Sequence, residues 1–266
     1  MSVVLISGCS SGFGMGAAVA LAHRGETVVA TMRDLEKAEP LLTAADGTDL
    51  DLLSLDVTDP SSRNDAVSKV IDKHGRIDVL INNAGLCSLG AAEILGEDDL
   101  RAQFETNVFG AFALIEAVLP DMRARKSGRI VNITSVAAFI APQFMTGYAA
   151  SKHAMDAITA GMALELQDFN IYMTSVAPAA YGTGLSANAK APTADTPYGE
   201  RPVRRYEEWI STMDGRADIS QVVEAIVEAA TVPSPKLRYL VTPSPPPFAA
   251  IVAEKNKFDE GRLAAG

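Results

Sequence analysis

The chain has 266 residues, 48% of them hydrophobic, and its 33 acidic and 23 basic residues give a formal net charge of −10. This acidic balance, without a basic stripe, argues against a nucleic-acid binder. Two cysteines, Cys9 and Cys87, and three scattered histidines form neither a disulfide framework nor a metal-ligand cluster. Because the sequence has no signal-type leader and no apolar run of about 20 residues, we expect a soluble, cytoplasmic protein without a membrane partner.

Short apolar runs and helical patterns alternate along most of the chain. Strands are expected at residues 3–7, 27–32, 50–55, 77–82, 129–134, 171–176 and 238–242. Helices are expected at residues 14–24, 35–44, 61–74, 98–125, 147–167 and 219–230. Several strands are apolar on both faces, as in a buried parallel sheet. The alternation predicts an α/β fold with one Rossmann-like, doubly wound parallel sheet of about seven strands and helices on both faces.

The first strand is followed by a glycine-rich turn, ISGCSSGFGMG, that opens the first helix. Glycines let the backbone approach a phosphate closely, and a helix N-terminus offers unpaired N–H groups and the positive end of its dipole. The spacing alone also fits an ordinary tight turn, but its place after the first strand favours dinucleotide binding. The residues expected to hold the cofactor here are Gly8, Ser10, Ser11, Gly12, Phe13 and Gly14.

The second strand ends at Met32, Arg33 and Asp34. An acidic side chain at this place binds the ribose hydroxyls of NAD, whereas a nearby arginine accommodates the 2′-phosphate of NADP. Arg33 therefore favours NADP(H), with NAD(H) possible. The alternative is that Arg33 is only solvated and that Asp34 caps the next helix.

Residues 179–218 interrupt the alternation with prolines, glycines and aromatic residues. We expect this insertion to act as a mobile substrate lid. The catalytic domain would then span residues 1–247. The tail, residues 248–266, comes after a proline run, and we expect a frayed end there rather than a short helix.

Further motifs stand in order along the chain: Asp56 after the third strand, NNAG at residues 82–85, Asn107, Ser135, and Tyr148 with Lys152 in Y-x-x-x-K. Together with the glycine turn they resemble the short-chain dehydrogenase/reductase family, over about residues 3–183 and the last helix and strand. The gap in Y-x-x-x-K is similar to that of the carbonyl and alcohol branch. The stretches SGCSSGFG and TMRDLEKA look most like the subgroup that acts on steroids, retinoids and other hydrophobic alcohols.

Hydride transfer between a carbinol carbon and a nicotinamide needs a partner for the proton on oxygen. A tyrosine of pKa about 10 is a poor base near neutrality, but an ammonium one helical turn away would lower that pKa. The resemblance implies that Tyr148 is the acid/base and that Lys152 tunes it and holds the nicotinamide ribose. It also implies that Ser135 orients the substrate oxygen and that Asn107 holds a proton-relay water. Taken singly, each of these side chains also fits an ordinary structural or solvated role.

The resemblance also assigns the rest of the cofactor site. It implies Asp56 and Val57 at the adenine, Asn83, Ala84 and Gly85 near the ribose, and Tyr148, Lys152, Pro178 and Thr183 near the nicotinamide. The sequence departs from the family pattern at two places. Ala179 follows Pro178 where the family usually has glycine, and Ser11 stands where NADP-preferring members often carry a basic residue.

Loop and lid side chains suggest an apolar pocket for a bulky ketone or secondary alcohol. The expected substrate-binding residues are Cys87, Ala137, Phe144, Tyr181, Leu185 and Trp209. Core packing explains Phe144 and Trp209 equally well, and no activating base stands near Cys87 in the sequence.

We therefore expect an NADP(H)-dependent oxidoreductase of a hydrophobic carbonyl/alcohol pair, with no metal. The alternatives are an NAD-dependent alcohol dehydrogenase and a catalytically silent nucleotide-binding scaffold. The resemblance further implies a homodimer or homotetramer that associates through helices 98–125 and 147–167.

Overall fold

The fold is built on one seven-stranded parallel sheet, seen in a computed structural model that describes residues 1–187, 189–214, 218–242 and 249–265. The strand order is β3-β2-β1-β4-β5-β6-β7. The strands are β1 Val3–Ile6, β2 Thr27–Met32, β3 Leu50–Ser54, β4 Val79–Asn82, β5 Gly128–Ile133, β6 Ile171–Pro178 and β7 Arg238–Val241. All lie within two residues of the expected bounds, and the predicted doubly wound sheet is confirmed. The order reverses between β1 and β4, and such a switch point is where parallel sheets bind ligands.

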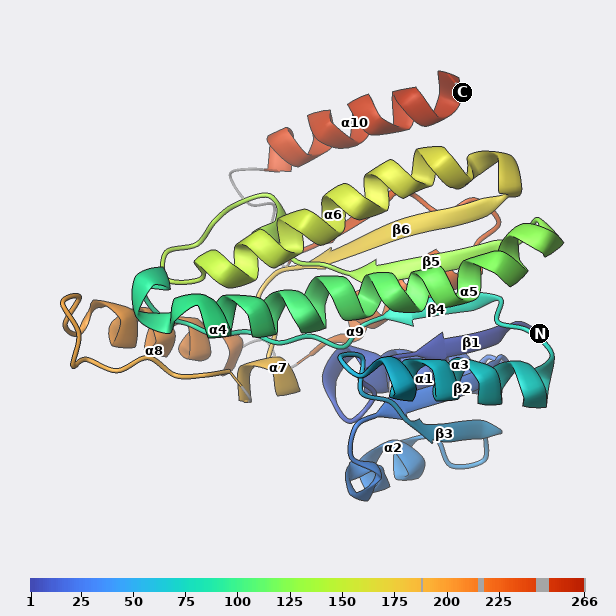
Figure 1. The fold of residues 1–266 in the computed structure, drawn as a ribbon, viewed down its shortest axis with the longest axis horizontal. Coiled ribbons are helices and arrows are strands. Elements are labelled where there is room, and N and C mark those ends of the chain that lie inside the picture. Colours follow the sequence, from blue (N-terminus) through green and yellow to red (C-terminus); the bar gives the residue numbers. More distant parts are fainter. Residues whose placement is uncertain (188, 215–217, 243–248, 266) are drawn as a thin grey trace.

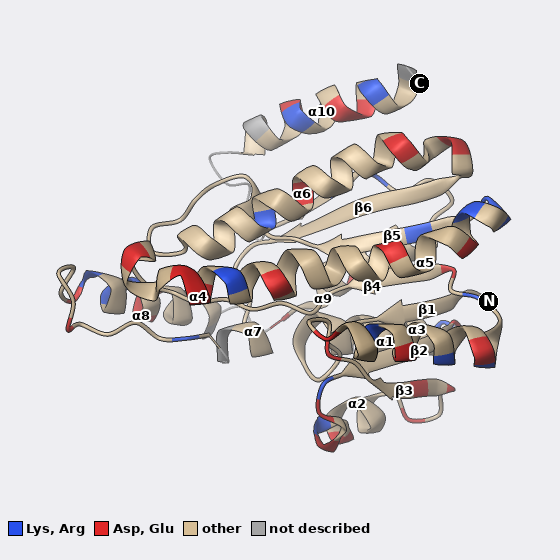
Figure 2. Cartoon of the chain, viewed as in Figure 1, with Lys and Arg blue, Asp and Glu red and all other residues tan. Residues whose placement is uncertain are grey.

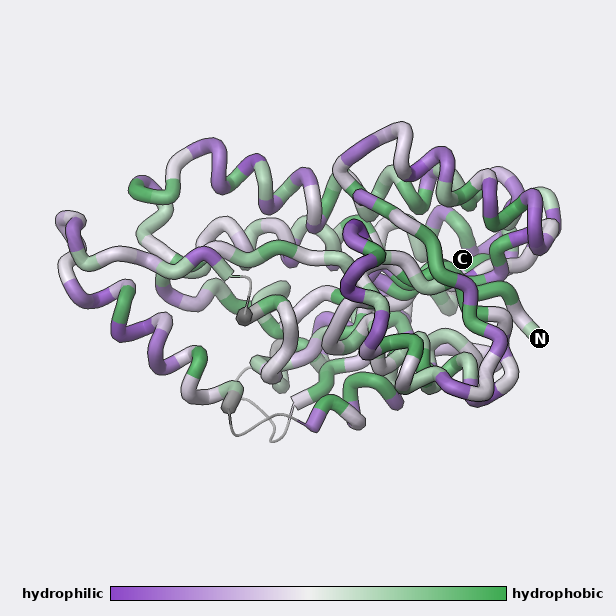
Figure 3. The backbone as a smooth tube through the Cα atoms, turned by 90° about the horizontal axis from the view of Figure 1, so that it is seen from below, coloured by the Kyte–Doolittle hydropathy of each residue, from purple (hydrophilic) through white to green (hydrophobic). Residues whose placement is uncertain are grey.

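Helices cover both faces of this sheet (Figure 1). They are α1 Gly12–His23, α2 Glu39–Ala44, α3 Pro60–His74, α4 Ala92–Phe104, α5 Ala111–Arg125, α6 Thr146–Leu166, α7 Gly184–Ala187, α8 Arg201–Asp214, α9 Ser220–Thr231 and α10 Ala249–Ala265. One core packs α1 and α9 on the sheet, and a second core packs α3, α5 and α6 on its other face. Charged residues gather on the helices and loops, while the strands are largely uncharged (Figure 2). Hydrophilic and hydrophobic stretches alternate along the outer helices (Figure 3).

Two expected helices differ from the structure. The helix expected at 35–44 is broken into a 3-10 turn, Leu35–Lys37, and the short α2, because Pro40 in the first turn of α2 has no N–H for a continuous helix. The helix expected at 98–125 begins earlier, at Ala92, and is interrupted by a π-helical segment, Glu105–Gly110. Such π segments often occur at functional sites.

The tail forms a helix, so the expectation of a frayed end was wrong. Helix α10 lies alongside α6 at the edge of the molecule (Figure 1), and its Val252 is only 2% exposed. Burial of this kind, together with ion pairs to α6 and β7, supplies the stabilisation that a short isolated helix lacks. The proline run before it falls within residues 243–248, which lie outside the described residues. Within the described part of the chain, the structure has no helix of the length and hydropathy that a bilayer crossing requires.

Candidate active site

A cavity of about 1270 Å3 opens along the carboxyl ends of the strands. The glycine turn, the ends of β2 to β6, the start of α6 and the lid all contribute to its wall. Of the residues predicted for the site, all but Gly14, Asn107 and Phe144 line this cavity. Side chains far apart in the sequence are therefore brought to one place by the parallel sheet.

The glycine turn adopts a backbone that other residues would strain. Gly8 and Gly12 have φ values of +75° and +60°, in the left-handed region. A Cβ at Gly8 would lie 2.9 Å from the Cα of Ala84, and one at Gly14 would lie 2.5 Å from the Gly8 carbonyl oxygen. Gly14 thus permits close packing of α1 behind the turn rather than lining the cavity. The first turn of α1, with N–H groups that have no partner inside the helix, forms part of the cavity wall.

Asn83 and Asp56 are both held by local hydrogen bonds. The Nδ2 of Asn83 donates to the carbonyl oxygens of Ser7 and Gly8, each at 2.9 Å, and so ties the end of β4 to the glycine turn. The Oδ1 of Asp56 accepts from the backbone N–H of Thr58 at 2.9 Å and from its hydroxyl at 2.7 Å. Both residues line the cavity, but these bonds also give them a structural role.

Ser135, Tyr148 and Lys152 share one buried wall of the cavity, with exposed fractions of 8%, 6% and 5%. The Nζ of Lys152 lies 5.6 Å from the centre of the Tyr148 ring and donates to the Ile133 carbonyl oxygen at 2.8 Å. Ser135 caps a 3-10 turn, Val136–Ala138, where its Oγ accepts from the Ala137 N–H at 3.1 Å. The end of β5 thus presents Ser135 to the same space that α6 reaches with its tyrosine and lysine.

Burial dominates the protonation of these groups. It raises the pKa of Tyr148 above its ordinary value, the Cys87 thiol adds to this rise, and the Ser135 hydroxyl opposes it. Burial also lowers the pKa of Lys152 from 10.5 to about 8. We expected Lys152 to lower the pKa of Tyr148; in this structure burial raises that pKa instead, because the phenolate would be removed from water. Tyr148 is therefore a protonated donor near neutrality.

Cys87 lies in this wall as a protonated thiol, since burial raises its pKa to about 12. Neither this value nor its surroundings indicate a nucleophile.

Asn107 lies behind the cavity wall, on the π-helical segment. Its Nδ2 donates to the Leu86 carbonyl oxygen at 2.8 Å and to the Ser151 hydroxyl at 2.9 Å. Its Oδ1 accepts from the Leu86 N–H at 2.7 Å. These bonds join the loop after β4 to α6, one residue from Lys152.

Phe144 does not line the cavity, which corrects its predicted substrate contact. Its backbone has a φ of +64°, an uncommon conformation for a bulky residue. Its ring packs edge-on against Tyr198 with centroids 6.1 Å apart, and the guanidinium of Arg201 lies 5.7 Å from the ring centre. The residue therefore joins the loop before α6 to the lid.

The lid is fastened to the body near α4. Lys190 forms an isolated parallel bridge with Ser88, and its Nζ lies 2.6 Å from Asp99. The hydroxyl of Tyr198 donates to Glu93 at 2.7 Å.

Several cavity residues were missed by the sequence reasoning. They include Lys37, Thr106, Met145, Arg205 and Met213. Arg205 and Met213 flank the predicted Trp209 at four-residue intervals on α8, and that helical spacing was the signal that could have revealed them.

A parallel sheet with a glycine turn at its switch point and a buried Ser-Tyr-Lys group on one cavity wall defines a dinucleotide-binding oxidoreductase. The sequence profile of the short chain dehydrogenase family matches residues 2–194. The chain belongs to this family.

Relatives and solved structures agree with this assignment. The chain is 44% identical to human retinol dehydrogenase 8 over 181 residues, which are 66% of this chain and 57% of that protein. It is 37% identical to the 3-ketodihydrosphingosine reductase of Bacteroides thetaiotaomicron over 70% of the chain and 66% of the relative. It is 32% identical to human 17-beta-hydroxysteroid dehydrogenase type 1, over 91% of this chain and 77% of that protein. The alignment thus spans little more than half of retinol dehydrogenase 8.

Among solved structures, a short-chain dehydrogenase from Streptomyces avermitilis superposes with a TM-score of 0.82 at 31% identity, over 100% of this chain and 99% of that one. A single-residue variant of actinorhodin polyketide ketoreductase with NADPH superposes with a TM-score of 0.77 at 27% identity, over 90% of this chain and 95% of that one. The expected resemblance, including that to retinol and steroid enzymes, is confirmed.

Proposed function

We propose that this chain interconverts a ketone and its secondary alcohol with NADP(H), and that Tyr148 is the acid/base. The observation that carries the proposal is the meeting of Ser135, Tyr148 and Lys152 on one buried wall of the cavity that begins at the glycine turn. When bound, the nicotinamide supplies or accepts the hydride. Tyr148 gives the proton to the substrate oxygen or removes it, and Ser135 donates a hydrogen bond to the same oxygen.

The raised pKa of Tyr148 suits its role as proton donor in the reductive step. A phenol that stays protonated near neutrality is ready to donate to a carbonyl, whereas oxidation needs the phenolate. Lys152 stands one helical turn away, where its ammonium stabilises a phenolate once that forms and donates to a ribose hydroxyl.

The end of β2 supports NADP(H) as the preferred cofactor. Arg33 and Lys37 both line the cavity there, and two cations suit a 2′-phosphate. The carboxylate of Asp34, which would favour NAD, already accepts from the Glu36 N–H at 3.1 Å and lies 3.5 Å from Lys37 Nζ. Ser11 remains the feature that favours the alternative, an NAD-dependent alcohol dehydrogenase.

An apolar ketone or secondary alcohol fits the part of the cavity away from Arg33 and Lys37. The described residues that line the cavity there include Leu86, Ile140, Pro142, Met145, Tyr181, Leu185 and Trp209. The names of the relatives point to retinol, ketodihydrosphingosine and steroid, which are bulky and largely apolar. A substrate of this class would bury its body against these side chains.

Replacing Tyr148 with phenylalanine tests the proposal. The variant should bind cofactor as the wild type does and lose about a hundredfold or more of turnover on an active ketone, because the proton donor is gone. Tyr198→Phe is the matched control, since that lid phenol donates to Glu93 of α4 and does not line the cavity. Near-normal turnover by the Tyr148 variant would remove this residue as the acid/base. Tight cofactor binding by the wild type with no turnover across ketones and secondary alcohols would favour a silent scaffold.

Replacing Arg33 with alanine tests the cofactor preference. Binding of NADPH should weaken about tenfold or more, and binding of NADH should change little, because only NADPH carries the 2′-phosphate. Fluorescence titration of each reduced cofactor measures both constants. Arg24→Ala is the control, an exposed arginine at the end of α1. Equal weakening for the two cofactors would contradict the assigned role.

We also propose that two copies associate through the face of α4, the π-helical segment and α5. Ile94 and Leu100 on α4 and Phe109 on the π-helical segment are 47%, 44% and 55% exposed, and a second copy would cover this apolar area. The molar mass measured by light scattering should be at least that of a dimer. Phe109→Glu should reduce it to the mass of the monomer, because the interface would bury an unpaired charge.

A further inference from the structure

Helix α8 presents one continuous stripe of side chains to the cavity. Arg205, Trp209 and Met213 recur at every fourth residue, and all three line it. Residues at this spacing lie on one face of a helix, and the stripe spans about 12 Å. Met213 is 3% exposed, and Trp209 packs against the apolar cluster that contains Tyr148 and Cys87.

Arg205 gives this stripe a cationic end. Among the described lining residues, the other basic side chains are Arg33 and Lys37 at β2 and Lys152 beside Tyr148. Arg205 is therefore the one cation that the described part of the lid brings to the cavity, and the same part of the lid also lines it with the apolar side chains Trp209 and Leu185. A charge in such surroundings needs a partner when a ligand removes water from it.

The present partner of Arg205 is weakly held. Its Nη1 lies 3.1 Å from Glu208 Oε2, and the two side chains are 42% and 65% exposed. Exposed pairs three residues apart contribute little, so a better-placed anion can replace this one. The guanidinium has five N–H donors in a planar fork that matches a carboxylate or a phosphate.

The start of α8 also favours an anion nearby. Arg201 precedes Arg205 by one helical turn in the first part of α8, in a chain whose overall charge is −10. Arg201 is held over the Phe144 ring, which places its charge at the joint between lid and body. The positive end of the helix dipole adds to the potential of these arginines.

We propose that Arg205 binds an anionic group, a carboxylate or a phosphate, at the end of the substrate remote from its reacting carbonyl. This inference rests on the proposed function and narrows its substrate to an amphiphile. The apolar body lies along Trp209 and Met213, the carbonyl reaches Tyr148, and the anion pairs with Arg205. A neutral apolar ketone would bind without this contact.

Trp209 makes the proposal measurable without turnover. It is the single tryptophan of the chain and lies one helical turn from Arg205 on the same stripe. Decanoate, decyl phosphate and decanol are titrated against the full-length protein, with tryptophan fluorescence as the signal. The protein variants are wild type, Arg205→Met, Arg205→Lys and the control Arg204→Met, which replaces an exposed arginine outside the cavity lining.

The wild type and the Arg204 variant should bind at least one of the two anions about tenfold more tightly than decanol. Arg205→Met should lose that advantage and bind decanol unchanged, and Arg205→Lys should keep part of it. The stronger of the two anions identifies carboxylate or phosphate. Equal affinity for anions and decanol, or anion binding that survives Arg205→Met, would overturn the inference.

Turnover of 9-oxodecanoate and decan-2-one separates this inference from the proposed function. The inference and the proposed function are both supported if the wild type reduces both ketones and has a higher kcat/KM for 9-oxodecanoate. Arg205→Met should then remove this advantage by raising the KM for the acid. Reduction of decan-2-one without any anion advantage leaves the proposed function in place and refutes the role of Arg205. Anion binding through Arg205 without reduction of any ketone or oxidation of any alcohol refutes the proposed function alone.

Discussion

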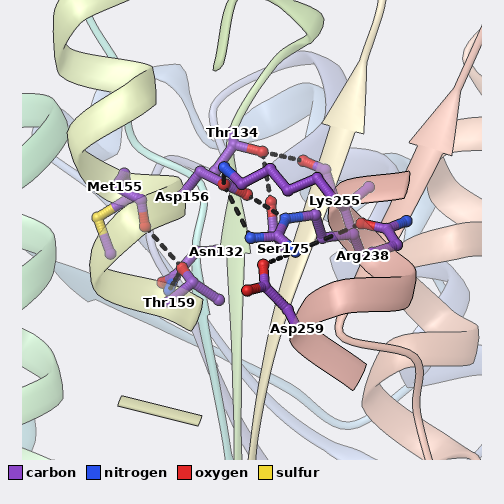
Figure 4. Close-up of polar contacts among 11 residues, drawn as sticks. Asn132, Thr134, Met155, Asp156, Thr159, Ser175, Arg238, Lys255 and Asp259 are labelled. Atoms are coloured by element: carbon purple, nitrogen blue, oxygen red, sulfur yellow. Dashed lines mark hydrogen bonds and ion pairs between the residues drawn. The ribbon is translucent and has the colours of Figure 1, made fainter. Parts of the chain in front are cut away.

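Replacing Asp156 with alanine should destabilise the fold strongly, because it leaves a buried guanidinium without its main partner. Arg238 on β7 is 1% exposed at its side chain, and Asp156 on α6 is fully buried. The carboxylate accepts from Arg238 Nε at 2.7 Å and Nη2 at 3.0 Å, and from Lys255 Nζ at 2.7 Å (Figure 4). On the other side of the guanidinium, Nη1 donates to Asp259 of α10 at 2.8 Å.

The expected cost follows from this geometry. Removing one partner of a buried ion pair costs about 3–5 kcal/mol, since the remaining charge stays desolvated. Asp259 still neutralises Arg238 in part, and Lys255, 41% exposed, can return to water. We therefore expect the lower part of that range, about 3 kcal/mol. The double variant Asp156→Ala/Arg238→Leu should lose clearly less than the sum of the two single variants, because it removes both buried charges.

Urea denaturation followed by circular dichroism gives the free energy of unfolding of each variant. Glu260→Gln is the matched control on α10, since that side chain is exposed and should change stability by less than about 0.5 kcal/mol. A loss below about 1 kcal/mol for Asp156→Ala, or a double variant whose loss equals the sum, would refute the reasoning.

Two further predictions concern the site. Gly14→Ala should abolish cofactor binding or folding, since its Cβ would lie 2.5 Å from the Gly8 carbonyl oxygen and against the Asn83 amide. Gly161→Ala in α6, with open space around its Cβ, should instead stabilise by about 0.5–1 kcal/mol; equal thermal unfolding curves for the two variants would contradict this. Between pH 8 and 10.5 the unfolded chain holds a proton that folded Lys152 has released, so wild-type stability should rise with pH relative to Lys152→Met. The gain should approach about 3 kcal/mol in urea titrations, and a difference independent of pH would show that Lys152 is not desolvated.

The strands and most helices were predictable because their signals are local. The run at 27–32 is apolar and β-branched over most of its length, and the structure has β2 at those residues. The helix expected at 147–167 appears as Thr146–Leu166, a stretch without proline that is rich in alanine and other good helix formers. By contrast, α10 has little amphipathic pattern of its own, and its stability comes from Asp156 and Arg238, which lie far away in the sequence.

By itself the sequence determined which chemical groups the protein has and in what order: the glycine turn, then Ser135, then Tyr148 and Lys152. Motif spacing carries this information because it reflects the backbone turns and helical turns that each group needs. Only the tertiary structure decided that Phe144 turns to the lid, that α8 directs Arg205 and Trp209 to the cavity, and that burial raises the pKa of Tyr148. These outcomes depend on which surfaces pack together and how much water they exclude. The spacing of residues along the chain determines neither of them.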